Sequence, residues 1–198
     1  RGRPRRGGRV TVQHILIGVG VLYGGSEIVL ALLLRSRDNV ARGSDRGSLG
    51  ILWTTITLAI FAAIQVAARH PGPVPGPAAA WVGAGLALLL AGLALRWTAI
   101  LTLRGAFTVD VAIARDQHLV ERGPYRRVRH PAYTGNLLAF LGMALLFADW
   151  VAALTLVLPI TAAFLYRIRV EERALRAAFG DEYGRYARRT WRLVPFLY

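Results

Sequence analysis

Five long apolar segments constrain the fold of this 198-residue chain more than any other feature. They cover residues 10–34, 49–68, 78–103, 132–147 and 150–166. A helix needs about 20 apolar residues to cross a bilayer core, where only helices and closed barrels satisfy their backbone groups. The sequence therefore predicts an all-α fold, an integral membrane bundle of about five transmembrane helices, with residues 1–198 forming a single membrane domain. Only Ala148 and Asp149 separate the last two segments, which predicts a tight helical hairpin.

Arginine is spread unevenly between these segments and predicts how the bundle is oriented. All 25 basic residues are arginine, and the formal net charge is +14. Most of them lie in residues 35–48, in residues 104–131 and after residue 166, three regions that share one side of a five-span bundle. Because arginine-rich loops face the cytoplasm, we expect a multi-pass protein of the cell membrane with a cytoplasmic C-terminus. Arginines placed between apolar blocks indicate membrane lipids as partners and no nucleic acid.

The absence of cysteine removes several kinds of site. Without cysteine the chain can form no disulfide, thiolate nucleophile or cysteine-ligated metal centre. Its four histidines show no H-x-x-x-H spacing, so a zinc-protease helix is also excluded. We therefore predict no metal site.

The longest polar stretch between apolar segments runs from Gly105 to His130 and is a candidate functional loop. Gly123-Pro124 predicts a turn, and His130-Pro131 predicts the start of a helix, since proline is tolerated in a first helical turn. Arg129 and His130 would then lie beside a helix N-terminus, which attracts anions. The alternative is that these arginines only contact lipid headgroups.

A second polar group follows the last apolar segment. We expect a helix to continue from Tyr166 to about Phe179 and to end at Gly180. Arg167 and Glu171 are four residues apart and share a face of this helix, and Glu172 follows directly. If the acidic pair meets the basic helix start at His130, the two form a site with both charge signs, suited to a zwitterion such as an amino-acid head group. The alternative is ordinary interfacial charges.

Glycines and two charged residues mark the interior of the first and third segments. The small residues Gly20, Gly24, Gly25, Gly83, Gly85 and Gly92 predict close helix packing. Glu27 is either a polar packing contact or part of a substrate cavity. Arg96 lies near the cytoplasmic end of its segment. Its role stays open, and the simplest interpretation is that it extends its guanidinium to the interface.

Several motifs in the second half of the chain occur together. The sequence R-H-P-A-Y-T-G follows Q-H-L-V-E-R-G-P-Y and precedes the hairpin, and E-E-R-A-L, F-G, Y-G-R-Y and a late proline follow it. In this order the motifs resemble the isoprenylcysteine carboxyl methyltransferase family and its phospholipid methyltransferase relatives, which are integral membrane enzymes that use S-adenosyl-L-methionine. The resemblance covers a methyltransferase-like core at about residues 96–198. Residues 1–95 add the first two spans and most of the third.

The resemblance implies roles for particular residues. The implied cofactor-binding residues are Gln117, His118, Leu119, Val120, Tyr125, His130, Pro131, Ala132, Tyr133 and Glu171. Glu171 would hold the α-amino group of the cofactor, and Arg167, the implied catalytic residue, would face the methyl acceptor. Gln117 stands where the family has a histidine. The implied reaction transfers a methyl group from a sulfonium to a lipophilic acceptor, an isoprenoid or lipid carboxylate.

Two alternatives of other classes remain. A membrane reductase of the sterol type would use NADPH, and the chain has no G-x-G-x-x-G motif. A scaffold or small transporter with a basic cytoplasmic face would catalyse nothing. Inverted repeats, which many transporters contain, are not visible in the sequence.

Overall fold

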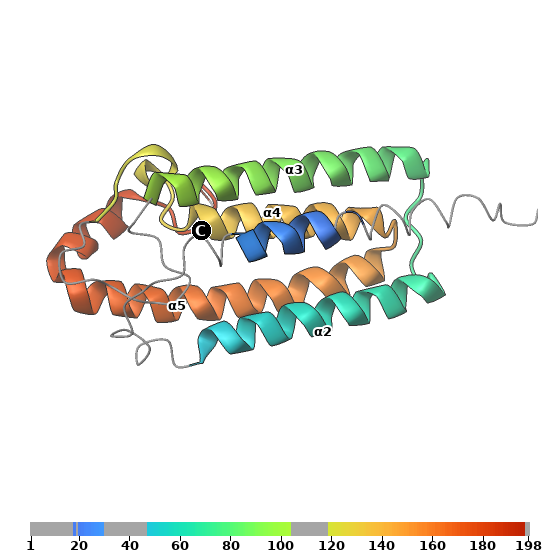
Figure 1. Ribbon diagram of the computed structural model, residues 1–198, viewed down its shortest axis with the longest axis horizontal. Helices are drawn as coiled ribbons and strands as arrows, with labels where there is room; N and C mark the ends of the chain where they lie inside the picture. The colour runs from blue at the N-terminus through green and yellow to red at the C-terminus, as the bar shows by residue number, and fades with distance from the viewer. Residues whose placement is uncertain (1–17, 19, 30–46, 104–118, 197–198) are drawn as a thin grey trace, which may run out of the picture. The chain divides into compact units, whose positions relative to one another are not determined.

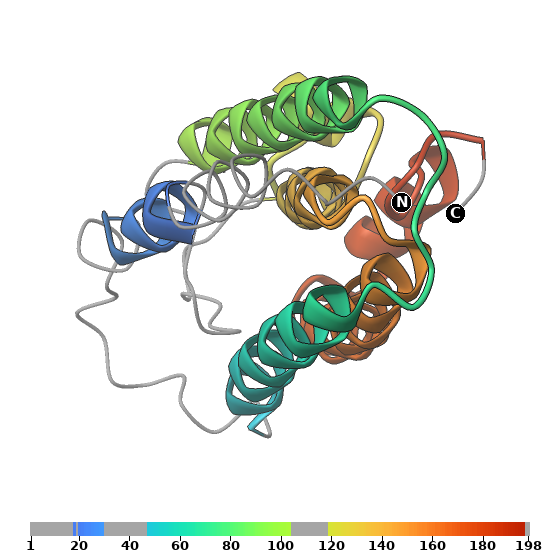
Figure 2. The ribbon, with the colours of Figure 1, turned by 90° about the vertical axis from the view of Figure 1, so that its right-hand side faces the viewer.

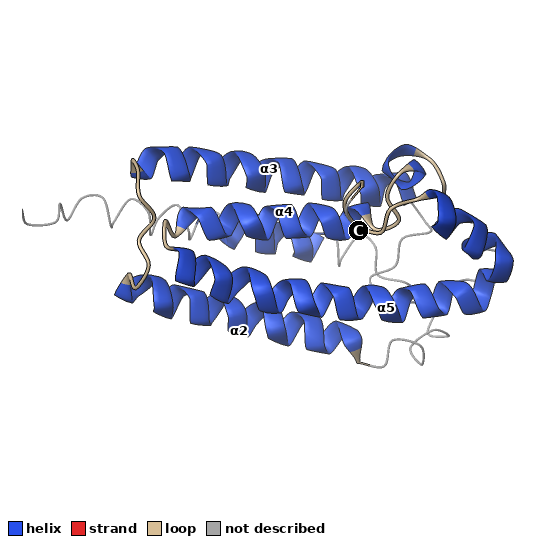
Figure 3. Cartoon of the chain, turned by 180° about the vertical axis from the view of Figure 1, so that it is seen from behind, coloured by secondary structure: helices blue, strands red, loops and turns tan. Residues whose placement is uncertain are grey.

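The computed structural model describes residues 18, 20–29, 47–103 and 119–196, and within these ranges it is built from helices (Figure 3). The helices are α2 (Ser48–Arg69), α3 (Ala78–Leu103), the short 3-10 helix η3 (Gly123–Arg126), α4 (Pro131–Leu146) and α5 (Trp150–Arg189). The all-α prediction is confirmed. Both η3 at Gly123-Pro124 and the start of α4 after His130 lie where the sequence predicts them.

Residues 1–35 and residues 36–198 form separate compact units. In the first unit, residues 20–29 are helical and fall within the first predicted span. The close helix packing that the sequence predicts for Gly20, Gly24 and Gly25 stays a prediction. Glu27 lies half-buried in this helical segment.

Three helices of the second unit, α2, α3 and α5, are long and apolar enough to cross a membrane. Helix α4 is apolar but has only 16 residues. Exposed leucine, phenylalanine and tryptophan side chains cover the outer faces of these helices, for example Leu58, Phe61 and Leu101 at 62–63% exposure. Such a surface matches a lipid solvent, and the chain is a helical membrane protein.

Glycines let α3 and α4 approach until their backbones touch (Figure 1). A Cβ at Gly92 of α3 would lie 2.5 Å from the backbone oxygen of Gly135 and 2.5 Å from the backbone nitrogen of Ala139. A Cβ at Gly142 would lie 2.5 Å from the backbone oxygen of Gly85. The predicted close packing is therefore confirmed for Gly85 and Gly92. At Gly83 a Cβ would meet no described atom within 4 Å, so Gly83 takes no part in this α3–α4 contact.

The packing order of the helices differs from their order along the chain. Helix α3 packs on α4, α4 on α5, and α5 on α2, as the view along the bundle shows (Figure 2). The core between them is apolar, with Leu89, Phe140, Leu156 and Phe164 at most 1% exposed. Two helical hairpins, α2–α3 and α4–α5, are thus interleaved so that α4 and α5 lie between the arms of the first.

One end of the bundle is closed by the loops after α2 and α4. Asp149 is buried and caps α5 by accepting a hydrogen bond from the backbone nitrogen of Ala152 (3.0 Å). Its other oxygen accepts from the backbone nitrogen of Gly72 (2.9 Å), and the nitrogen of Trp150 donates to the Gly72 oxygen (2.9 Å). These bonds join the two hairpins at the end that we call the loop end, defined by residues 70–77 and 147–150.

At the opposite end, α5 continues far beyond the apolar segment and then turns back. Gly180 has φ 49° and ψ −123°, a left-handed conformation that only glycine adopts freely, and it breaks the helix where the sequence predicts a stop. The chain then resumes helical structure to Arg189 and returns toward the start of α4 (Figure 1). We call residues 181–196 the C-terminal arm.

Candidate active site

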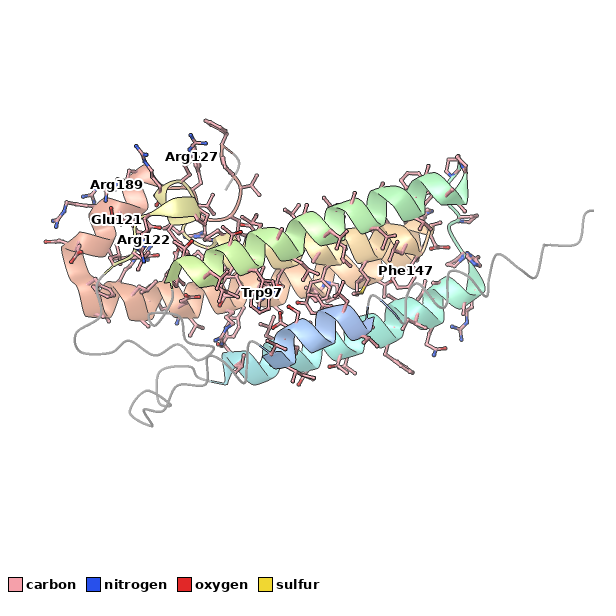
Figure 4. All side chains as sticks on the ribbon, turned by 45° about the horizontal axis from the view of Figure 1, so that its top comes forward. Trp97, Glu121, Arg122, Arg127, Phe147 and Arg189 are labelled. Carbon is pink, nitrogen blue, oxygen red and sulfur yellow. The ribbon has the colours of Figure 1, made fainter. Side chains whose placement is uncertain are left out.

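The C-terminal arm is fastened along the segment that leads into α4. The backbone nitrogen of Arg129 donates to the oxygen of Trp191 (2.8 Å), and the nitrogen of Trp191 donates to the oxygen of Arg127 (2.9 Å). One turn into α4, the hydroxyl of Thr134 donates to the oxygen of Leu193 (2.8 Å). A surface ion pair between Arg189 and Glu121 adds a contact at the same end, opposite Phe147 at the loop end (Figure 4). The arm therefore brings residues near 192 against His130.

Glu172 is the centre of a buried charge cluster formed by these segments. Only 3% of its side chain is exposed. Its Oε1 accepts from Arg129 Nε (3.2 Å) and Arg192 Nε (3.0 Å), and its Oε2 accepts from Arg192 Nη2 (3.0 Å). Burial would raise the pKa of Glu172, but the hydrogen bonds from His130 and Arg192 outweigh it and hold the pKa well below its usual value. Glu172 is thus an ionised group that joins α5, the start of α4 and the arm.

His130 lies between both glutamates of the acidic pair. Its Nε2 is 3.3 Å from Glu172 Oε1, and its Nδ1 is 3.8 Å from Glu171 Oε2. The ring is almost fully buried and stacks on Tyr133 with ring centroids 5.7 Å apart. The predicted meeting of the acidic pair with the basic start of α4 is confirmed.

Arg167 and Tyr133 continue the site toward the membrane. Arg167 is buried, and its Nε donates to the hydroxyl of Tyr133 (3.2 Å) while its Nη1 donates to the hydroxyl of Ser48 (2.7 Å). A guanidinium, a phenol and a serine hydroxyl therefore form one chain of contacts, with Ser48 at the first turn of α2 as its far end.

Tyr125 and Arg96 line the same region from η3 and α3. Burial, with a further contribution from the Glu171 carboxylate, raises the pKa of Tyr125, so this phenol stays neutral. The Arg96 charge opposes this shift. Arg96 is only 8% exposed, so the interpretation that it extends to the interface is wrong. Its backbone lies against Gly135 in the close α3–α4 contact.

The structure brings some of the expected cofactor-binding residues into one cluster, and the others lie elsewhere or outside the described residues. Tyr125, His130, Tyr133 and Glu171 interact with one another directly or through charge, as described above. Pro131 and Ala132 form the buried first turn of α4. Leu119 and Val120 lie half-buried in the loop before η3. Gln117 and His118 lie outside the described residues.

Sequence reasoning missed two contributors to this site, Ser48 and Arg192, and left the role of Arg129 open. Ser48 begins α2, far from the motifs, and no local pattern marks it. Glu172 and Arg192 are 20 residues apart, and their pairing depends on the reversal at Gly180. The sequence left two interpretations of Arg129 open, an anion site and contact with lipid headgroups. In the structure Arg129 instead donates to Glu172 and to the backbone oxygens of Ala187 and Thr190 in the arm.

A carboxylate oxygen of Glu171 indicates what the site could hold. Glu171 Oε2 is buried and has no hydrogen bond with any described residue. A buried carboxylate oxygen without a donor is unfavourable, and an ammonium group would satisfy it. His130 Nδ1 lies 3.8 Å from this oxygen, and the His130 ring stacks on Tyr133, whose hydroxyl accepts from Arg167. The residues present therefore fit a ligand that carries an amino group next to a larger body.

Known proteins of similar sequence include several methyltransferases. Residues 85–177 match the isoprenylcysteine carboxyl methyltransferase (ICMT) family. A probable protein-S-isoprenylcysteine O-methyltransferase of Oryza sativa subsp. indica is 31% identical over 179 residues, 89% of this chain and 92% of the relative. Protein-S-isoprenylcysteine O-methyltransferase B of Arabidopsis thaliana is 36% identical over 115 residues, which are 57% of this chain and 58% of that protein.

Another relative carries a different name, and a solved structure shares the fold. The cobalt-zinc-cadmium resistance protein CzcN of Cupriavidus metallidurans is 41% identical over 85 residues, 42% of this chain and 38% of the relative. The solved structure of the eukaryotic intramembrane Ras methyltransferase ICMT matches with a TM-score of 0.63 and 22% identity. That match covers 95% of this chain and 67% of the other, and it establishes the likeness of the folds. The chain belongs to the isoprenylcysteine carboxyl methyltransferase (ICMT) family of membrane methyltransferases.

Proposed function

We propose that this protein transfers a methyl group from S-adenosyl-L-methionine to a lipophilic carboxylate acceptor at the cytoplasmic face of the membrane. The observation that carries the proposal is the buried Glu171 Oε2, which has no donor among the described residues and lies 3.8 Å from His130 Nδ1. An amino-acid head group supplies the ammonium that this position requires.

The cofactor would bind at the end of the bundle where α4 begins. Glu171 would accept from its ammonium group, and His130, Tyr125 and Tyr133 would surround the adjoining part. When bound, the cofactor supplies an electrophilic methyl group on a sulfonium. The protein's task is then to position and desolvate two partners, which accounts for a large share of the rate in such displacements.

Arg167 would orient the acceptor. A carboxylate is already a nucleophile and needs no base, whereas an amine acceptor would first have to lose a proton. The Arg167 guanidinium offers charge-assisted hydrogen bonds to a carboxylate, held by Ser48 and Tyr133 in a buried setting. Relatives are named protein-S-isoprenylcysteine O-methyltransferases, and an isoprenoid or lipid carboxylate is the acceptor class that we propose here.

The orientation follows from charge. The arm and η3 carry exposed arginines, among them Arg126, Arg127, Arg185 and Arg188, and the same end of the bundle holds the site. Positively charged segments face the cytoplasm, where a water-soluble cofactor is available. The acceptor would enter sideways from the bilayer.

Calorimetric titration of the detergent-purified protein with S-adenosylhomocysteine and with NADPH tests the proposal. Binding of S-adenosylhomocysteine alone is the expected result. Binding of NADPH alone would favour a reductase, and binding of neither would favour a scaffold. Transfer of radiolabelled methyl from the donor into a lipid extract then identifies the acceptor class.

Glu171→Gln is expected to weaken S-adenosylhomocysteine binding by about 10- to 100-fold, since hydrogen bonds to charged groups contribute about 1.5–3 kcal/mol. The fold should survive, because the side chain is 31% exposed and does not join the Glu172 cluster. Titration of the variant measures the affinity, and Glu182→Gln, an exposed acidic position on the arm, is the matched control. Unchanged affinity in Glu171→Gln would remove Glu171 from the cofactor site.

Arg167→Gln is expected to leave S-adenosylhomocysteine affinity within a few-fold of the parent and to lower turnover by about 100-fold, the effect of losing one charged hydrogen-bonding partner of a buried anion. The glutamine retains a polar contact with Ser48 and avoids a large cavity. Methyl transfer to the identified acceptor measures the turnover. Parent-like turnover would take Arg167 off the list of catalytic residues.

A further inference from the structure

The two glutamates of the acidic pair make different contacts. Glu172 accepts from Arg129, His130 and Arg192, and its side chain is 3% exposed. Glu171 is 31% exposed at its side chain, and its Oε2 is the buried oxygen without a hydrogen bond among the described residues. Glu172 is therefore saturated with protein donors, and Glu171 is not.

The contact between Glu172 and His130 determines where the imidazole carries its hydrogen. An ionised carboxylate can only accept hydrogen bonds. For the 3.3 Å contact from His130 Nε2 to Glu172 Oε1 to be a hydrogen bond, Nε2 must therefore carry hydrogen. A neutral ring protonated at Nε2 has a free lone pair at Nδ1. That lone pair faces Glu171 Oε2 at 3.8 Å, too long for a hydrogen bond between them.

We propose that Glu172 is a positioning residue that fixes the Nε2–H tautomer of His130, so that His130 Nδ1 and Glu171 Oε2 together accept hydrogen bonds from one ammonium group. The part of this inference that concerns the ammonium group rests on the proposed function. An ammonium has three donors and no acceptor, and two acceptors about 4 Å apart can each take one of them. The opposite tautomer would turn Nδ1–H toward the ligand and repel it.

The surroundings of His130 hold this arrangement in place. Arg129 and Arg192 bind Glu172 from the start of α4 and from the arm, so the carboxylate is fixed from two directions. Arg176, one turn further along α5, lies 3.6 Å from Glu172 Oε2. The ring stacks on Tyr133, and the His130 backbone nitrogen donates to the oxygen of Arg192 (3.2 Å), which limits rotation of the ring and of the chain.

The tautomer can be measured on the ligand-free protein. Protein labelled with ¹⁵N in its histidines is studied by NMR in detergent at about pH 8, above the usual pKa of histidine, and His130→Asn assigns the His130 signals. The expected spectrum has a protonated Nε2 and an unprotonated Nδ1. A ring protonated at Nδ1, alone or together with Nε2, would overturn the inference whether or not the protein binds a methyl donor.

Variants of Glu172 distinguish a role in positioning His130 from a purely structural role. In Glu172→Gln the amide can donate as well as accept, so His130 should populate both neutral tautomers and give signals from each. S-adenosylhomocysteine affinity should fall by about 10- to 100-fold, the effect of one lost charged hydrogen bond. Affinity for methylthioadenosine, which has no amino-acid end, should change less than threefold, a shift below about 0.7 kcal/mol. Equal losses for both ligands would show that Glu172 only supports the fold and would overturn the inference.

Arg192→Gln is the matched control. It removes the two hydrogen bonds between Arg192 and Glu172 but leaves the Glu172–His130 contact in place. We expect the His130 tautomer to stay as in the parent protein, even if the variant unfolds at a lower temperature. A mixed tautomer in Arg192→Gln would assign the control of His130 to the arm and overturn the role of Glu172. If the parent protein binds no S-adenosylhomocysteine, the proposed function fails, and the NMR result still decides the tautomer.

Discussion

Gly92→Leu is expected to lower the free energy of unfolding by about 3 kcal/mol or more and to separate α3 from α4. The first atom of any side chain at position 92 would lie 2.5 Å from backbone atoms of Gly135 and Ala139. Backbone cannot rotate away as a flexible side chain does, so the helices must move apart. Because Arg96 lies one turn further on α3, the shift also displaces the wall of the active site.

Thermal unfolding in detergent, followed by size-exclusion chromatography, measures the effect. Gly83→Leu is the matched control, because it lies on the same helix with no atom within 4 Å of an added Cβ. It should unfold at the parental temperature. Equal stability of Gly92→Leu and Gly83→Leu would contradict the close contact between α3 and α4.

Glu172→Ala is expected to destabilise the protein by about 3 kcal/mol or more, the usual effect of removing one partner from a buried charge pair. The substitution leaves Arg129 and Arg192 buried or half-buried beside His130 without their shared carboxylate. The arm loses its main side-chain bond to α5. Chemical denaturation followed by circular dichroism measures the loss, and Glu182→Ala on the exposed face of the arm should unfold like the parent.

The same cluster predicts how stability depends on pH. The folded state holds the pKa of Glu172 below its unfolded value, so the unfolded chain binds the proton more readily. The stabilisation by Glu172 is therefore complete above its unfolded pKa, near 4.3, and decreases as the pH falls toward the folded pKa. The difference in stability between the parent and Glu172→Ala should shrink across this acidic range. A difference independent of pH below about 4 would mean that the Glu172 charge does not stabilise the fold.

The lengths of the apolar segments predicted the described spans closely, because lipid offers the backbone no hydrogen-bonding partners. The apolar segments 49–68 and 78–103 correspond to Ser48–Arg69 and Ala78–Leu103, and Pro131 begins α4 as expected. In a bilayer an apolar run of this length can satisfy its backbone only as a helix. Composition and helix signals were therefore sufficient for these elements.

The site was predicted only in part, for reasons that lie in tertiary structure. Adjacent residues on a helix point about 100° apart, so Glu171 and Glu172 had to differ, but the sequence could not tell which one is buried. That depends on Arg129 and Arg192, which reach Glu172 from 43 and 20 residues away. A positive φ at Gly180 ends a helix without specifying where the chain goes next. Ser48 became part of the site only because α2 packs on α5.

The bonds of Asp149 and Gly72 at the loop end have a mechanical consequence for the opposite end of the bundle. Because they fasten the two hairpins to each other there, a relative tilt of the hairpins uses that end as its fulcrum. Helix α2 has 22 residues and is about 33 Å long, so a tilt of about 5° displaces its far end by about 3 Å. The displacement of α2 is largest at Ser48, which hydrogen-bonds Arg167 of the other hairpin, so such a tilt acts most strongly on that contact.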